Sequence, residues 1–331
     1  MVDQAHPVIN NSQPINLGSA RINTSSPTAL VSVTNQATGT PQAALNASIS
    51  GNPPVTASGS FNLLNPGSTN NTSLQVGMNT GNAGHITGTA TVALVSDANN
   101  VGNCTPNCQL NLPAQNVNVA LDVYRLANPV LNTAALTLAG RVGGVGDSSH
   151  LSGAVSISNS SPDAFTEGLT VNRGALTSVP ANGFSSAGGI TNLAAQGTSS
   201  NAIQVSLNTG TSGSYTGSQG LNYVSTGAGT DGATDLGVGS ASVGLTGHVY
   251  TPAVALLNTG TPVNFNIVHV GDVVSQALSV TNAAPVSGLN DTLLASFSAA
   301  LRFASPPASR RPPCSALAIT AWSRVKPVSR Q

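Results

Sequence analysis

Hydrophobic and polar residues alternate along most of this chain with a period of two. The clearest example is residues 117–123, where valine or leucine fills every odd position and asparagine, alanine or aspartate every even one. Residues 74–78 and 90–94 repeat the pattern with other residue types. Such alternation predicts β-strands that bury one face and expose the other. No stretch before residue 302 shows the 3.6-residue period and caps of an amphipathic helix.

Short runs of turn-forming residues separate these segments. Residues 65–67, 81–84 and 229–232 are rich in glycine, asparagine and aspartate, which tolerate the positive φ angles of tight turns. Short strands with turns between them are typical of an immunoglobulin-like β-sandwich. The sequence therefore predicts an all-β fold with antiparallel sheets. Aromatic residues make up only 3% of the chain, so valine, leucine, isoleucine and alanine must fill the cores.

The chain repeats itself at the length of a whole domain. Residues 74–81 recur as 203–210, a shift of 129 residues, and Asn35, Asn159 and Asn282 end three related segments. Such spacing exceeds the ~20–50 residues of a solenoid repeat and fits a small domain. The predicted organisation is an N-terminal leader, two sandwich repeats, a truncated third copy and an irregular tail. Their boundaries are 1–13, 14–129, 130–253, 254–301 and 302–331.

Charge divides the chain where the third copy breaks off. Residues 1–301 hold all ten acidic residues and four basic ones, a net charge of −6, whereas residues 302–331 hold six basic residues and no acid. Only 6% of all residues are charged, against the ~25% usual for soluble domains. An acidic body without lysine argues against nucleic-acid binding. The basic tail is expected to result from a shifted reading frame or a truncated gene, with a functional tail as the alternative.

Three segments carry a resemblance to a known family. They are residues 270–282 in the third copy and residues 88–97 and 123–129 in the first. These segments resemble choice-of-anchor D domains, which are bacterial surface repeats with immunoglobulin-like folds. The resemblance spans most of residues 14–298 and implies a secreted or cell-surface repeat protein. Its motifs mark strands and turns rather than reactive groups, so it implies no catalytic residues.

Two pairs of residues are candidates for a cross-link or a ligand site. Cys104 and Cys108 could close a disulfide, remain reduced, or form half of a zinc site, for which no second pair with ligand spacing follows. Asp231 and Asp235 lie in a glycine-rich loop and could bind calcium, which takes six to eight oxygen ligands. An ordinary polar hairpin loop explains the two aspartates more simply, because Asp and Gly are common turn residues. We expect a disulfide and a polar loop.

Catalytic groups do not form a pattern in this sequence. The five histidines are scattered, and Glu167 is the single glutamate, so the paired acids of a glycosidase are not indicated. Serine is so abundant that no particular Ser-His-Asp set is marked out. We expect neither an enzyme nor a cofactor.

Two non-catalytic functions remain. The first is a secreted or cell-surface array that acts as a spacer, matrix component or adhesin, with surface or matrix components as partners. Self-association is also expected, because a body without lysine leaves strand edges poorly guarded. The alternative is a carbohydrate- or ligand-binding module that uses Tyr215 and Tyr223, with glycans as partners.

The expected location is extracellular or at the cell surface. No run of 18 apolar residues predicts a membrane span. Residues 1–7 lack the basic start and apolar stretch of a signal peptide, so we expect that signal and anchor lie outside this sequence.

Overall fold

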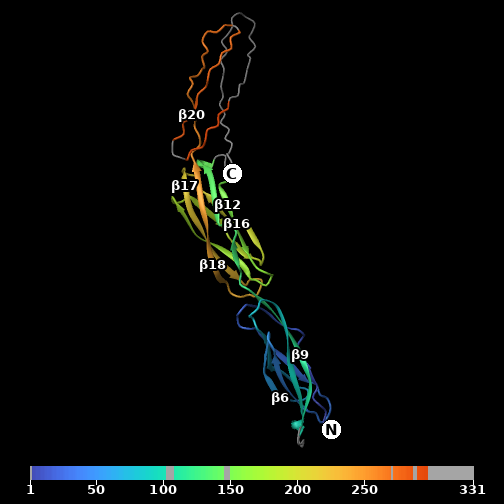
Figure 1. Ribbon diagram of the computed structural model, residues 1–331. Helices are drawn as coiled ribbons and strands as arrows, with labels where there is room; N and C mark the ends of the chain where they lie inside the picture. Colours follow the sequence, from blue (N-terminus) through green and yellow to red (C-terminus); the bar gives the residue numbers. More distant parts are fainter. Residues whose placement is uncertain (1, 102–107, 145–149, 270, 286–288, 297–331) are drawn as a thin grey trace.

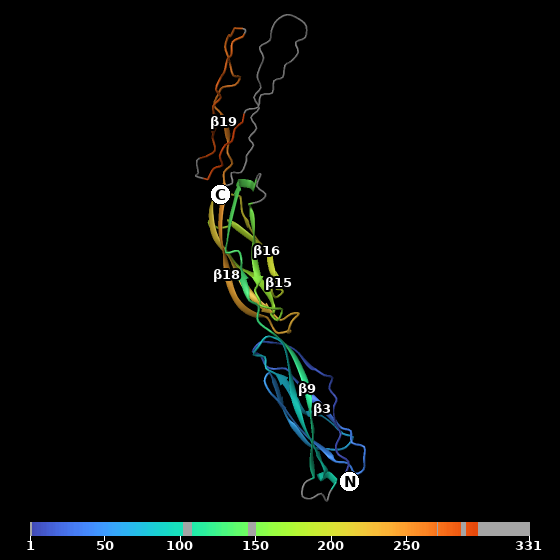
Figure 2. The same ribbon diagram turned by 45° about the vertical axis from the view of Figure 1, so that its right-hand side comes forward.

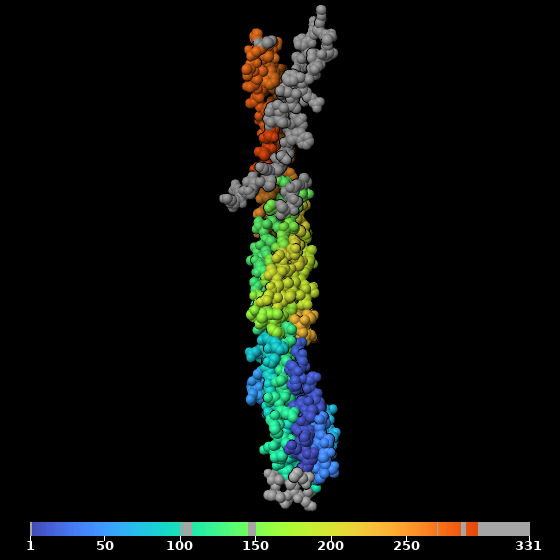
Figure 3. Space-filling view, turned by 90° about the vertical axis from the view of Figure 1, so that its right-hand side faces the viewer, coloured from blue at the N-terminus to red at the C-terminus, as the bar shows by residue number. Residues whose placement is uncertain are grey.

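A computed structural model describes residues 2–101, 108–144, 150–269, 271–285 and 289–296. These residues form two β-sandwiches placed end to end, with part of a third copy beyond the second (Figures 1 and 2). The space-filling view shows a narrow rod in which the two bodies meet over a short region (Figure 3). The described residues contain no α-helix, only the short 3₁₀ turns η1 (Ala98–Val101) and η2 (Val142–Gly144). No helix in this described part is long and apolar enough to cross a membrane.

The first sandwich packs a four-stranded sheet against a five-stranded one. The four-stranded sheet has the order β1 (Pro7–Ile9), β3 (Thr28–Asn35), β7 (Thr69–Met78), β5 (Val55–Ser58). The five-stranded sheet has the order β2 (Ile15–Arg21), β9 (Gln109–Tyr124), β8 (Gly84–Asp97), β4 (Ala44–Gly51), β6 (Ser60–Leu64).

The second sandwich repeats this topology strand for strand. Its four-stranded sheet has the order β10 (Pro129–Leu131), β12 (Ser152–Asn159), β16 (Thr198–Leu207), β14 (Phe184–Gly188). Its five-stranded sheet has the order β11 (Ala135–Arg141), β18 (Leu236–Tyr250), β17 (Gly213–Thr226), β13 (Gly168–Val179), β15 (Ile190–Leu193). The predicted fold class, tandem immunoglobulin-like β-sandwiches, is confirmed.

One strand pair in each sandwich departs from the expected antiparallel arrangement. β2 runs parallel to β9, and β11 runs parallel to β18, while the other pairs within the two sandwiches are antiparallel. β1 and β10 pair in the four-stranded sheets, and the chain then crosses to the five-stranded sheet, where β2 or β11 pairs. Because the chain crosses between sheets and does not turn back in a hairpin, this strand can run parallel to its neighbour. Alternation along a strand reports burial but not the direction of its neighbour, so this detail was not predictable.

The cores contain the residues that the alternation marked. Val117, Val119, Leu121 and Val123 are fully buried, as are the apolar residues of β7. Burying one such side chain contributes roughly 1.5–3 kcal/mol relative to exposure. Each sandwich has its own apolar cluster, so each copy has the core of an independent domain.

The asparagine at the end of β3 and of β12 explains one of the sequence repeats. Both side chains are fully buried, and each amide group donates to a carbonyl oxygen of the chain entering the opposite sheet. The third copy contains the same bond at an exposed asparagine. The three bonds run from Asn35 to Ala43 (3.1 Å), from Asn159 to Glu167 (2.9 Å) and from Asn282 to Asp291 (3.0 Å).

A glycine marks the point where the chain passes from the four-stranded to the five-stranded sheet. Gly59 follows β5 and Gly188 ends β14, and both have positive φ, 114° and 90°. A Cβ atom at either position would lie 1.9 Å from a backbone oxygen, that of Ser73 or Ala202. Only glycine fits this crossing, because it combines a left-handed conformation with close backbone approach.

The third copy begins as the first two do. β19 (Ala255–Leu257) pairs with β20 (Val280–Asn282) in the register that β1 makes with β3. The segment 1–13, expected to be a leader, contains β1 and so contributes a strand to the first sandwich. Residues 302–331, expected to be an irregular tail, lie outside the described residues. The origin of this tail in a shifted reading frame therefore remains a prediction.

Candidate functional site

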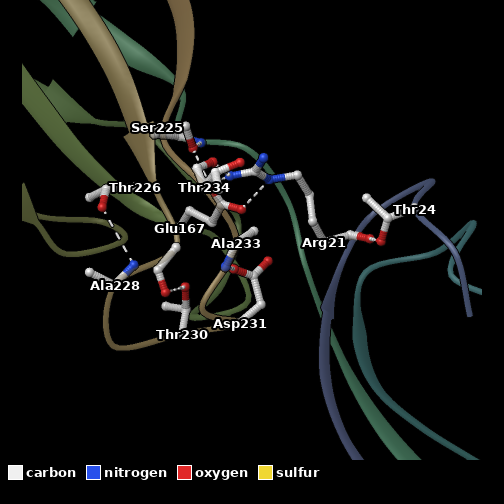
Figure 4. Close-up of polar contacts among 12 residues, drawn as sticks. Arg21, Thr24, Glu167, Ser225, Thr226, Ala228, Thr230, Asp231, Ala233 and Thr234 are labelled. Carbon is white, nitrogen blue, oxygen red and sulfur yellow. Dashed lines mark hydrogen bonds and ion pairs between the residues drawn. The ribbon is translucent and has the colours of Figure 1, made fainter. Parts of the chain in front are cut away.

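The junction between the two sandwiches brings together most of the charged residues of the second module. β9 ends at Tyr124, and residues 125–128 connect it directly to β10. Arg21 ends the neighbouring strand β2 and therefore lies at the same end of the first module. The segment 160–167 and the loop 227–235 of the second module face it (Figure 4).

Arg21 and Glu167 form a bidentate ion pair across this junction. Nε of Arg21 donates to Oε1 of Glu167 at 2.5 Å, and Nη2 donates to Oε2 at 2.9 Å. Nη2 also donates to the carbonyl oxygen of Thr234 at 2.8 Å. The hydrogen bond with Glu167 raises the pKa of Arg21 above its usual value. A guanidinium group suits this task because its planar fork matches both oxygens of a carboxylate.

Glu167 is also held by hydrogen bonds on the side of the second module. The Ser225 hydroxyl donates to Oε2 of Glu167 at 2.5 Å, and the Ala127 amide donates to that hydroxyl at 2.8 Å. The Glu167 side chain has no exposed surface, while that of Arg21 is 12% exposed. A carboxylate so deeply buried needs its cation, because an unpaired buried charge is strongly destabilising.

Asp231 is a second carboxyl group at this junction. Its Oδ1 accepts a hydrogen bond from the Ala233 amide at 2.9 Å, whereas Oδ2 is buried and has no hydrogen-bond partner among the described residues. Burial raises the pKa of Asp231, and the neighbouring Glu167 raises it further, while Arg21 acts in the opposite direction. Arg21 therefore faces more than one acid at this junction.

Contacts of other kinds support the ion pair. The Ser19 hydroxyl of the first module donates to the Thr230 carbonyl of the second at 3.0 Å. The rings of Tyr124 and Phe165 lie 5.7 Å apart between centroids, within the range of favourable aromatic pairs. The connecting chain pairs with the second module, because the Arg125 amide donates to the Phe165 carbonyl at 3.0 Å. Apolar, polar and charged contacts therefore act together at one junction.

The same junction recurs between the second copy and the third. Arg141 ends β11 as Arg21 ends β2, and its Nε donates to Oδ2 of Asp291. Asp291 accepts the amide of the strand-ending Asn282 on its backbone, the position that Glu167 occupies in the second copy. The side chains of Arg141 and Asp291 are 15% and 19% exposed. An arginine of one copy thus meets an acid of the next at both junctions.

The sequence did not mark out Arg21 or Glu167 as a pair. They are 146 residues apart, and neither belongs to a known motif. The signal that could have found them is scarcity: few residues of the body are charged, yet arginine and acid recur at matching positions of successive copies.

The two aspartates expected as calcium candidates do lie at this junction. Asp235 acts on Arg21 only through its charge, and Asp231 bonds within its own loop. In the described part of the chain, no three His, Cys, Asp or Glu side chains come together as a metal group would require. Arg21 donates to the Thr234 carbonyl oxygen of the same loop and interacts with both aspartates through charge alone. The polar loop that we expected and the calcium alternative are both left untested.

The other candidates lie elsewhere. Tyr215 and Tyr223, expected as exposed aromatic ligands, are only 7% and 5% exposed and belong to the second core. The expectation is corrected because both rings pack within the second apolar cluster, where the Tyr215 ring lies edge-on to Phe184 at 6.5 Å between centroids. Cys108 is disulfide-bonded. Its expected partner Cys104 lies outside the described residues, so that pairing remains a prediction.

Comparison with known proteins gives distant likenesses of fold. No family model matches the sequence, and no curated protein does. Solved structures similar to it include protocadherin gamma B7 extracellular cadherin domains 1–4 (12% identity, TM-score 0.37, covering 77% of this chain and 54% of that one). Another is mouse cadherin-23 EC22–24 (12% identity, TM-score 0.34, covering 77% of this chain and 70% of that one). A third is DIP-gamma IG1+IG2 (11% identity, TM-score 0.27, covering 73% of this chain and 97% of that one). The chain spans about half the length of the first of these structures.

These likenesses are too weak to transfer any activity or partner. The strands of this chain themselves define the class of the protein, which is a tandem array of β-sandwich modules joined end to end.

Proposed function

We propose that this protein is a non-catalytic spacer or adhesin-like arm, built from modules whose junctions hold them in line. The observation that supports this most directly is the recurrence of the arginine–acid junction, at Arg21–Glu167 and again at Arg141–Asp291. A chain that needed only two independent domains would gain nothing from burying a charge between them. A rod gains stiffness, because the buried pair penalises any bend that exposes or separates it.

The proposed location is the cell surface or the extracellular space. The disulfide at Cys108 supports an oxidising compartment. The segments at 88–97, 123–129 and 270–282 support kinship with choice-of-anchor D surface repeats. A rigid arm of this kind would display whatever lies beyond it at a distance from the surface, and repetition would add weak contacts along its length.

Small-angle X-ray scattering of the purified chain tests the proposal. We expect an elongated particle whose scattering agrees with two sandwiches held end to end in one orientation. The variant Arg21→Leu should broaden the distribution of lengths, because it removes the cation of the first junction. Arg173→Leu, at an exposed arginine remote from the junction, is the matched control. Wild-type scattering that requires freely hinged modules would contradict the spacer.

The alternative of a carbohydrate-binding module has lost its aromatic candidates, because Tyr215 and Tyr223 are buried. Sugar stacking needs an exposed ring face, so we do not assign this function to them.

A further inference from the structure

Charged residues avoid one sheet of every module. The strands β1, β3, β5 and β7 contain no Asp, Glu, Lys, Arg or His, and neither do β10, β12, β14 and β16. The five-stranded sheets carry charges on exposed positions, among them the His85–Asp122 pair at 2.6 Å and Arg173. A body with a net charge of −6 therefore offers one face per module on which that charge is absent.

The outer surfaces of the two four-stranded sheets match in chemistry as well as in lack of charge. Strand register places residues of corresponding rows side by side, and each row combines apolar side chains with uncharged polar ones. In the first module the rows are Val8–Thr34–Thr69 and Leu30–Gln75–Ser58. In the second they are Val130–Ser158–Thr198 and Ala154–Gln204–Ala187.

The rim of this face is fixed by a repeated hydrogen-bonded bracket. In each copy, the asparagine after the edge strand donates from its side chain to two hydroxyl groups on, or directly before, the strand paired with it. The brackets are Asn10 to Ser32 and Thr34, Asn132 to Ser156 and Ser158, and Asn258 to Ser279 and Thr281. The polar groups of the rim are thereby ordered without charge and without a ligand.

Apolar side chains stand exposed on this surface. Val8 and Val130 occupy the same place on the edge strands and are 36% and 41% exposed, and Leu30 is 46% exposed. Beside Leu30, a shallow hollow opens over Gly77, between Thr28 and Thr56. A surface with protruding apolar groups, a hollow and uncharged donors and acceptors can pack against a copy of itself, since no like charges oppose each other.

We propose that the outer surface of the four-stranded sheet is the site at which a second copy of this chain associates laterally. This deepens the proposed function and rests on it, because a rod that presents the same uncharged face in each module can form several contacts with a partner rod. Association through the five-stranded sheets would instead bring charged side chains of two copies together, among them Arg173 and the His85–Asp122 pair. The hydroxyl and amide groups supply hydrogen bonds, and the valines and Leu30 supply the buried apolar area.

Charge placed in the centre of the face tests this site. Gln75 and Gln204 occupy equivalent positions on β7 and β16, the inner strands of their sheets. We expect the double variants Gln75→Lys/Gln204→Lys and Gln75→Glu/Gln204→Glu to weaken self-association at least about tenfold in sedimentation equilibrium. Both signs should act alike, because each variant buries a charge without a partner.

The matched control is Thr87→Lys/Thr216→Lys, which places the same charges at equivalent exposed positions of β8 and β17 in the other sheet. It should change the association constant by less than about twofold. Equal thermal unfolding midpoints establish that the variants are folded.

Three outcomes would overturn the site. They are a wild-type chain that stays monomeric at high concentration, association insensitive to the Gln75 and Gln204 changes, or equal weakening by the control. Glycan-array binding that Gln75→Lys abolishes, with no self-association, would assign the face to sugars instead. X-ray scattering from a dilute monomer measures the elongation and stiffness of one chain without any lateral contact. Failure of the lateral contact can therefore be distinguished from failure of the proposed spacer.

Discussion

At the scale of single residues, buried polar groups decide how each sandwich closes. Asn159 has no exposed surface, and its side chain makes three hydrogen bonds, accepting from the Asn128 amide and donating to the Glu167 and Leu193 carbonyls. One side chain therefore connects the entering chain, the strand and the opposite sheet. Such a group stabilises only when fully satisfied, because a buried unsatisfied donor or acceptor costs ~1–3 kcal/mol.

The substitution Asn159→Asp tests this role. Aspartate has the same shape, but it lacks both donors and would bring its charge against two carbonyl oxygens. We expect the free energy of unfolding of the second module to fall by ~3 kcal/mol or more, measured by urea denaturation followed by circular dichroism. Asn282→Asp, at the equivalent but exposed position of the third copy, should cost far less. Equal effects at the two sites would contradict the burial argument.

Asp231 makes the stability of the junction depend on pH. Because burial raises its folded pKa above the unfolded value of ~3.9, the folded state binds this proton more tightly than the unfolded state. The stabilisation is therefore complete below the unfolded pKa and is lost as pH rises through the folded pKa. Asp231→Asn keeps the Oδ1 acceptor and removes the titration.

We accordingly expect Asp231→Asn to unfold at a higher temperature than the wild type at pH 7, with the difference shrinking toward pH 3. Thermal denaturation across this range measures it, and Asp235→Asn, at an exposed aspartate in the same loop, is the control. A difference that does not change with pH would show that titration of Asp231 plays no part.

At the scale of elements, the crossing between sheets depends on a glycine. Gly188 lies where β14 leaves one sheet and β15 joins the other, and Gly59 has the same place in the first module. The chain can change sheets without a loop only because the backbone of the adjacent strand approaches closely at this point.

Gly188→Ala should therefore be severely destabilising. The added Cβ would lie 1.9 Å from the Ala202 carbonyl oxygen, and the alanine would have to adopt a φ of 90°. We expect a loss of more than ~3 kcal/mol in the unfolding free energy of the second module. Gly210→Ala, where a Cβ meets nothing within 4 Å, should be nearly neutral. A tolerated Gly188→Ala would mean that the strand can move aside.

Much of this element structure could be predicted, and the reason is physical. Val117 to Val123 alternate because one face of β9 is buried, and the repeat at 74–81 and 203–210 returns because β7 and β16 have the same neighbours. The parallel pairing of β2 with β9 and the burial of Tyr215 could not be predicted. The first depends on which sheet the preceding strand joins, and the second on packing across the core.

The contact between the two modules could not be predicted from the sequence either. Alternation describes one strand at a time, whereas Arg21 and Glu167 meet only after two complete modules have folded and been placed end to end. Their equivalence to Arg141 and Asp291 becomes visible once the strands of successive copies are matched. Contacts between modules are therefore best sought among rare charged residues at matching positions.

At the scale of the whole molecule, the stiffness of the rod depends on an arginine of one module that pairs with a buried acid of the next. Glu167 is fully buried, and a hydrogen bond from Ser225, which itself accepts from the Ala127 amide, holds it from the side of the second module. The arginine therefore does more than attract it: without Arg21 the second module would hold an uncompensated carboxylate. The first module thus contributes to the stability of the second.

The substitution Arg21→Leu is expected to lower the unfolding free energy of the second module by ~3–5 kcal/mol, although the changed residue lies in the first. Arg21→Leu/Glu167→Leu should recover most of this loss, because apolar residues replace both members of the pair. Two-transition urea unfolding resolves the modules, and Glu167→Leu alone completes the double-mutant cycle. If the single and double variants lose the same stability, the pair is not coupled, and the modules are held in line by the Tyr124–Phe165 contact and the short connection instead.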